Sequence, residues 1–124
     1  MSTRKIMILD DDEQYLEAMS ALLEASGYTV RSCSKAVEGL AALREFKPHC
    51  LVLDLYMPAL NGNELLPWIR CQEPNMPVVV CTGMEFDAFH LSSYGVRWIL
   101  RKPFTEKAFF DTIQQAVEQF RSVA

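Results

Sequence analysis

Hydrophobic residues fall along the chain in two alternating patterns, short continuous runs and longer segments with helical spacing. The short runs, rich in Ile, Leu, Val and Cys, predict β-strands at 6–9, 28–33, 50–53, 77–81 and 97–100. The segments between them place apolar residues three or four positions apart, which predicts helices at 13–26, 35–46, 63–71, 85–93 and 105–121.

Residues at the ends of the predicted helices support these boundaries. Gly27 is placed to stop the first helix. Thr105 can cap the last helix, with Phe104 and Phe109 placed to pack against each other across its first turn. Pro67 falls early in the third helix, where we expect it to delay the start or bend the axis.

Strict alternation of strand and helix predicts a parallel sheet covered on both faces. The wholly apolar runs 6–9, 50–53 and 77–81 suit central strands, and the more polar runs 28–33 and 97–100 suit the edges. Right-handed crossovers then give the strand order 2-1-3-4-5, a flavodoxin-like arrangement. The predicted fold class is α/β, a single-domain (βα)5 doubly wound sandwich.

Composition supports one globular domain spanning residues 1–124. Half of the 124 residues are hydrophobic and 23% are charged, a balance that excludes a disordered chain. The net charge of −4 argues against a general nucleic-acid surface, and no apolar run is long enough for a membrane span. The four cysteines show no Cys-x-x-Cys spacing: Cys33, Cys50, Cys71 and Cys81. We expect Cys50 and Cys81, which lie in apolar runs, to be buried small hydrophobes, and a reducing cytoplasm fits.

Acidic residues stand where two of the predicted central strands end. Asp10, Asp11 and Asp12 follow the first strand, and Asp54 follows the third. Neighbouring parallel strands would bring these carboxylates together, and two unit charges ~4 Å apart repel by ~4 kcal/mol at an effective dielectric of about 20. Such a cluster needs protons or a cation to offset it, and an oxygen-only anionic site suits Mg²⁺.

Two further polar signals occur at strand ends. Thr82 closes the fourth strand, and Lys102 follows the fifth within Lys102-Pro103-Phe104. Each signal alone is ordinary, because charged helix starts, turn aspartates and strand-end threonines are common. Their joint placement at the carboxyl ends of strands one, three, four and five predicts a functional site, since ligands of this fold bind at that edge.

With these residues in place, the chain resembles the receiver domain of two-component response regulators over roughly residues 4–122. The resemblance implies that Asp54, within Asp54-Leu55-Tyr56-Met57-Pro58, is the phosphoacceptor. It implies Mg²⁺ ligands from Asp10, Asp11, Asp54 and the backbone carbonyl of Tyr56. Asp12 would instead start the first helix.

The resemblance also implies roles for the remaining site residues and for partners. The Thr82 hydroxyl would turn toward the phosphoryl oxygens, and Lys102 would pair with Asp54 and then with the phosphoryl group. A sensor histidine kinase or phosphotransfer protein would donate the phosphoryl group. The phosphorylated domain would then act on a downstream protein or a further effector domain, with homodimerisation through the last helix and fifth strand open. It would be a signalling domain without turnover of free substrate, contacting neither nucleic acid nor membrane.

Three features depart from the family pattern. Ile99 stands where the family usually has an aromatic residue, and the adjacent Trp98 should point to the opposite face of its strand. The stretch between Thr82 and Lys102 is about two residues shorter than usual. Tyr56 and Met84 are large and uncharged at positions that influence hydrolysis in the family, so we expect a long-lived acyl phosphate.

Two other functions are weighed against the receiver assignment. Asp10-x-Asp12 resembles the first motif of haloacid dehalogenase-type phosphatases, but Gln14 stands where that motif needs Thr or Val, and Asp54 would have no role. A phosphorylation-independent receiver-like binding module is the second alternative, and the intact acidic site argues against it. The receiver and phosphatase hypotheses differ in the nucleophile, which is Asp54 in the first and Asp10 in the second.

Overall fold

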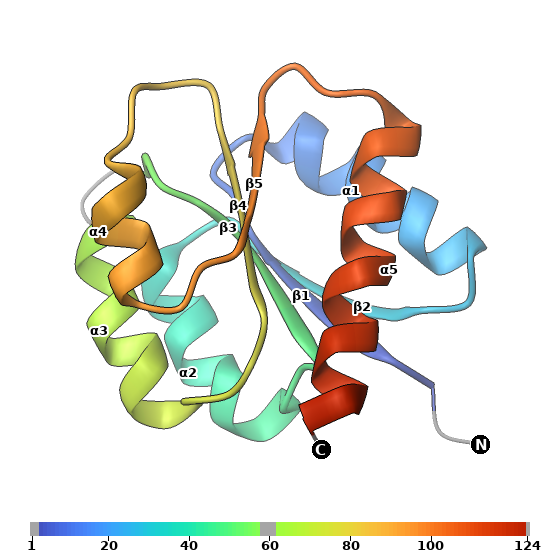
Figure 1. Ribbon diagram of the computed structural model, residues 1–124. Helices are drawn as coiled ribbons and strands as arrows, with labels where there is room; N and C mark the ends of the chain where they lie inside the picture. Colours follow the sequence, from blue (N-terminus) through green and yellow to red (C-terminus); the bar gives the residue numbers. More distant parts are fainter. Residues whose placement is uncertain (1–2, 58–61, 124) are drawn as a thin grey trace.

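A computed structural model describes residues 3–57 and 62–123, and Pro58 of the acceptor segment therefore lies outside it. The ten elements alternate as expected from sequence: β1 (Lys5–Leu9), α1 (Glu13–Ala25), β2 (Thr29–Cys33), α2 (Ala36–Phe46), β3 (Cys50–Asp54), α3 (Gly62–Gln72), β4 (Val78–Thr82), α4 (Ala88–Ser93), β5 (Trp98–Arg101) and α5 (Glu106–Val123). Figure 1 shows α1 and α5 on one face of the sheet and α2, α3 and α4 on the other.

All five strands are parallel, and their order is β2-β1-β3-β4-β5, so the predicted fold class and topology are confirmed. Every residue of β3 and β4 is buried, whereas β2 and β5 at the two edges are largely exposed or half-buried. Burial on both faces explains why the central strands are continuously apolar. Among the cysteines, Cys33, Cys50 and Cys81 are buried in the core and Cys71 is exposed.

Two hydrophobic cores fill the space between the sheet and its helix layers. One holds side chains from α1, α5 and the sheet, and the other holds side chains from α2, α3, α4 and the opposite sheet face. Trp98 packs against the first core and Ile99 against the second, as strand alternation predicted. Over residues 3–57 and 62–123, no helix has the length and apolarity needed to cross a membrane.

Local hydrogen bonds explain where the helices begin. Asp12 caps α1 by accepting from the N–H groups of Gln14 and Tyr15, which confirms its predicted place at the helix start. Thr105 Oγ1 accepts from Ala108 N–H (3.0 Å) and caps α5 as predicted.

Two helices differ from their predicted form. The fourth helix starts at Ala88, three residues later than predicted, because Asp87 accepts from the N–H groups of Phe89 and His90 and sets the first turn there. Pro67 lies inside α3, which starts at Gly62 and continues past it. Proline removes one N–H from the helical ladder, so packing rather than local propensity sustains this helix.

Arg70 ties the end of α3 to the loop that leads into β5. Its guanidinium donates to the carbonyl oxygens of Met76 (2.5 Å), Tyr94 (2.6 Å), Glu73 (3.1 Å) and Gly95 (3.5 Å). The α4–β5 connection is therefore held at the end of the sheet remote from the strand-end acids.

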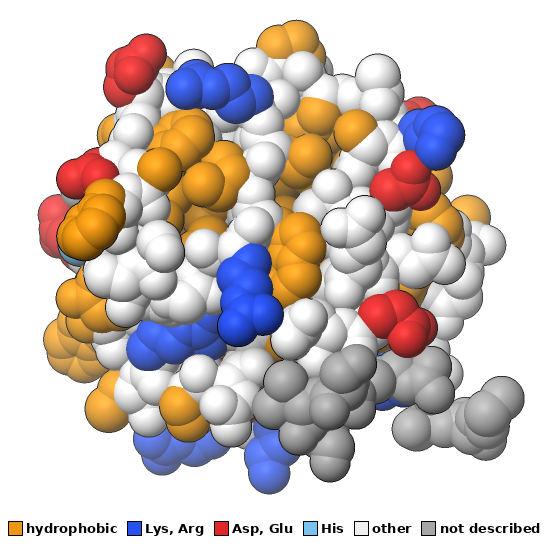
Figure 2. Space-filling view, in the orientation of Figure 1, with side chains coloured by type: hydrophobic (Ala, Val, Ile, Leu, Met, Phe, Trp, Pro, Cys, Tyr) orange, Lys and Arg blue, Asp and Glu red, His pale blue; other side chains and the backbone are white. Residues whose placement is uncertain are grey.

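At the other end of α4, Figure 2 shows hydrophobic side chains gathered near the loop that joins β4 to α4, which includes the exposed Met84.

Candidate functional site

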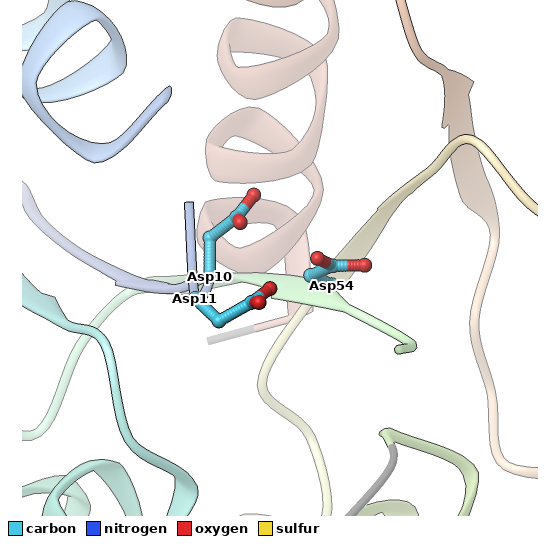
Figure 3. A group of neighbouring side chains, drawn as sticks. All are labelled: Asp10, Asp11 and Asp54. Carbon is cyan, nitrogen blue, oxygen red and sulfur yellow. The ribbon is translucent and has the colours of Figure 1, made fainter. Parts of the chain in front are cut away.

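The acidic cluster lies where β1 and β3 end side by side. The pairing of Leu9 with Leu53 places the next residues, Asp10 and Asp54, at the same edge of the sheet. One carboxylate oxygen each from Asp10, Asp11 and Asp54 lies within 4.8 Å of the others. Figure 3 shows Asp10 and Asp11 after the end of one strand and Asp54 close beside them at the end of the neighbouring strand. The predicted meeting of these acids is thus present, whereas Asp12 turns into the α1 cap.

Two of the three carboxylates are buried. Asp10 is 1% exposed and Asp54 is 7% exposed, while Asp11 is exposed to solvent. Backbone N–H groups hold one oxygen of each buried acid, because Asp12 donates to Asp10 Oδ1 (2.9 Å) and Tyr56 donates to Asp54 Oδ1 (3.2 Å). The second oxygen of each remains directed at a shared cation, the ammonium group of Lys102.

Lys102 bridges the two buried acids. Its Nζ lies 2.7 Å from Asp10 Oδ2 and 3.5 Å from Asp54 Oδ2. From the sequence we expected Asp54 as the partner of Lys102, and the shorter contact is with Asp10. Burial alone would lower the pKa of Lys102, but the hydrogen bond to Asp10 and the charges of both acids outweigh it and raise the pKa. Lys102 is therefore charged at neutral pH.

The electrostatic surroundings act most strongly on Asp54. Burial and the nearby negative charge of Asp10 raise the pKa of Asp54 from its ordinary 3.8 to about 6, against the opposing effects of the Tyr56 N–H and Lys102. A pKa of about 6 leaves the carboxylate mainly ionised at pH 7, with a negative charge that its surroundings only partly balance. Binding of a further cation would stabilise this ionised carboxylate.

Thr82 stands beside this cluster at the end of β4. It is fully buried, and its Oγ1 accepts from Met84 N–H (3.1 Å), which ties the hydroxyl to the loop before α4. Its backbone carbonyl accepts from Lys102 N–H (2.9 Å), so threonine and lysine are held on adjacent strands. The Lys102–Pro103 peptide that follows is cis.

Two contacts at this edge were not foreseen from sequence. The ring of Tyr15 lies under the Lys102 ammonium, with Nζ 4.3 Å from the ring centroid. The Tyr56 hydroxyl donates to the backbone carbonyl of Glu85, linking the loop after β3 to the loop after β4. Helical spacing places Tyr15 on α1, but no sequence pattern shows which distant side chain its ring will meet.

Comparison with known proteins agrees with this architecture. The family model described as "Response regulator receiver domain" matches residues 6–114. The crystal structure of a CheY-like receiver domain protein from Methanospirillum hungatei JF-1 superposes with a TM-score of 0.95 at 25% identity, covering 99% of this chain and 100% of that one. The receiver domain dimer of beryllofluoride-activated NtrC4 gives 0.87 at 29% identity, covering 94% and 98%.

Two relatives of different length show where such a domain occurs. The transcriptional regulatory protein GlrR of Escherichia coli (strain K12) is 32% identical over 92% of this chain, which spans only 26% of that protein. The polar-differentiation response regulator DivK of Brucella ovis is 28% identical over 90% of this chain and 94% of its own length. With its topology, its strand-end acids and its match over most of the chain, the protein belongs to the family of response regulator receiver domains.

Proposed function

We propose that this receiver domain accepts a phosphoryl group on Asp54 from a phosphohistidine of a sensor histidine kinase or phosphotransfer protein. One observation carries the proposal: Asp54 ends a central strand beside two other carboxylates and within 3.5 Å of a lysine ammonium. This arrangement supplies both a nucleophile and the positive charge that phosphoryl transfer requires. The chain would act as a signalling domain rather than as an enzyme with free-substrate turnover.

In the proposed step, an oxygen of ionised Asp54 attacks the phosphorus of phosphohistidine. A P–O bond forms, the P–N bond breaks, and the electron pair of that bond goes to the imidazole nitrogen, which takes up a proton. The Tyr56 N–H holds Asp54 Oδ1, which leaves Oδ2, the oxygen nearer Lys102, as the attacking atom. Orientation of this oxygen and neutralisation of charge are the main contributions of the protein.

The donor set fits a hard divalent cation. Asp10, Asp11 and Asp54 offer only oxygen atoms, close enough for one ion to contact all three, which matches the preference of Mg²⁺. We propose these three residues and the backbone carbonyl of Tyr56 as its ligands. When bound, Mg²⁺ would neutralise charge on the transferring phosphoryl oxygens.

Lys102 and Thr82 respond to the new charge. A phosphoryl group adds about −1.5 to −2 charge and three acceptor oxygens, so the Lys102 ammonium is drawn from Asp10 toward those oxygens. The Thr82 hydroxyl can donate to one of them, and because it accepts from Met84 N–H, its movement carries the loop before α4 with it. This loop movement is the proposed switch.

The proposed partners follow from the step and from the relatives. Residues 1–124 would form one receiver unit, with its core at about 4–122, acting on a downstream protein or on an effector domain as in longer regulators. The beryllofluoride-activated NtrC4 receiver domain is a dimer, and we propose a comparable homodimer through α5 and β5 as one signalling state. We also propose a cytoplasmic location, because the phosphoryl group of the donor protein originates from ATP.

The proposal is tested by phosphoryl incorporation from phosphoramidate, a small donor with a P–N bond, with and without MgCl₂. Intact-mass measurement should show one added phosphoryl group in the parent and in Asp87→Asn, a matched change of an exposed helix cap, and none in Asp54→Asn. Equal incorporation by Asp54→Asn would contradict the proposal. Phosphoryl labelling that persists in Asp54→Asn and is lost in Asp10→Asn would instead support the phosphatase alternative.

A further inference from the structure

The ammonium group of Lys102 has an aromatic ring as its third neighbour. Besides the oxygens of Asp10 and Asp54, its Nζ lies 4.3 Å from the centroid of Tyr15. A cation within about 6 Å of a ring centroid, over the ring face, is attracted by the electron density of that face. The Lys102 ammonium therefore contacts a carboxylate on two sides and the uncharged ring face of Tyr15 on a third.

Tyr15 is itself fixed from two directions. Its backbone N–H donates to the capping side chain of Asp12, which sets its place in the first turn of α1. Its ring packs against Phe104, with centroids 5.7 Å apart, and Phe104 stacks on the buried Phe109 of α5 at 5.6 Å. The row of rings runs from the acidic site into the core, so Tyr15 offers Lys102 a rigid support.

We propose that Tyr15 is a positioning residue that holds the Lys102 ammonium between Asp10 and Asp54. This role rests on the proposed function of the site. The lysine side chain has four rotatable bonds, and without the ring its charge has many positions within reach of the exposed Asp11 and of solvent. With the ring in place, the ammonium is confined to a path along one ring face that reaches both buried carboxylates.

The structure also indicates which part of Tyr15 matters. The attraction comes from the ring face and not from the hydroxyl group. Phenylalanine at position 15 should therefore preserve the contact with the Lys102 ammonium, and leucine should abolish it. Tyr28 offers a matched control, because it is a half-buried tyrosine that forms a different aromatic pair, with Phe110 at 6.5 Å. Any general loss of packing on this side of the sheet would affect Tyr28→Leu as well.

The test compares Tyr15→Phe, Tyr15→Leu and Tyr28→Leu by NMR of ¹⁵N-lysine-labelled protein and by phosphorylation rate. The Lys102 ammonium signal, assigned with Lys102→Met, should show an upfield ring-current shift in the parent, in Tyr15→Phe and in Tyr28→Leu. Tyr15→Leu should lose this shift and slow phosphorylation by phosphoramidate about three- to tenfold, whereas Tyr15→Phe should stay within about twofold of the parent.

The outcomes separate this inference from the proposed function. Retention of the Lys102 shift in Tyr15→Leu, or equal slowing in Tyr28→Leu, would overturn the positioning role. If the parent takes up no phosphoryl group, the proposed function fails, and the Lys102 signal still decides whether Tyr15 holds the ammonium. Urea unfolding of each variant shows whether a slower phosphorylation rate comes from incomplete folding. If it does, the Lys102 ammonium shift of the folded fraction decides whether Tyr15 positions the ammonium.

Discussion

Replacing Asp54 with asparagine should stabilise the unphosphorylated, metal-free protein at pH 7. Asp54 is 7% exposed and lies close to Asp10 and Asp11. Burial and the charge of Asp10 raise its pKa from 3.8 to about 6, so keeping it ionised at pH 7 costs free energy. Asparagine has nearly the same shape and carries no charge, so the variant avoids this cost.

The size of the effect follows from the change in pKa. Each unit corresponds to about 1.4 kcal/mol, so the full change would be worth about 3 kcal/mol. Solvent screening at the mouth of the site reduces this figure, and we expect a gain of about 1–2 kcal/mol in the free energy of unfolding. Because the folded-state pKa lies above the unfolded value, the parent is relieved of the cost as pH falls through 6, and the gain disappears near pH 4.

The measurement is urea unfolding of the parent and Asp54→Asn at pH 7 and at pH 4 without Mg²⁺, with Asp87→Asn as the control. Asp87 is an exposed helix cap for which asparagine is an equivalent cap, so its substitution should change stability little. MgCl₂ should then stabilise the parent more than Asp54→Asn, which has lost one of the charged ligands. An Asp54→Asn protein that is no more stable than the parent at pH 7, or that gains equally at both pH values, would refute the reasoning.

Three further predictions test other parts of the site and fold. Lys102→Met should tighten Mg²⁺ binding about three- to tenfold, because the ammonium no longer occupies an oxygen of Asp10. Titration calorimetry measures the affinity, and weaker binding by the variant would contradict this. Burial and nearby cations lower the pKa of His49, so in the Asp54→Asn background, where the opposing effect of Asp54 is absent, stability should decrease as pH falls below 6.5. If adding His49→Gln leaves that profile just as steep, His49 is excluded as the cause. Tyr56→Asn and Met84→Glu should shorten the phosphoryl lifetime if these side chains shield Asp54 from water, and unchanged lifetimes would remove that explanation.

Much of the fold could be predicted from hydrophobic spacing, because burial on both sheet faces leaves a distinct pattern. The fully buried β3 and β4 read as continuous apolar runs, and the polar residues of β2 and β5 reveal the edges. The start of α4 was misplaced because its spacing is weak and the cap at Asp87 determines the first turn. The hydrogen bonds from Arg70 to four backbone carbonyl groups were not predicted, since every residue has a carbonyl group and the sequence does not show which ones a distant side chain will contact.

The candidate site was predictable only as far as topology determines it. Strand ends of a parallel sheet meet at one edge, so the approach of Asp10, Asp11 and Asp54 follows from strand order. Side-chain geometry does not follow from strand order. The shorter Lys102 contact with Asp10 and the ring of Tyr15 beneath the ammonium depend on rotamers and on helix placement, which periodicity does not encode.

The central claim is that Asp54 is the phosphoacceptor, and identification of the phosphorylated residue tests it most directly. Protein treated with phosphoramidate and MgCl₂ is reduced with borohydride, which converts an acyl phosphate of aspartate to homoserine, and is then digested and sequenced by mass spectrometry. We predict homoserine at position 54 and at no other aspartate. Homoserine at Asp10 or Asp11, or its presence elsewhere in Asp54→Asn at the parent's level, would contradict the account.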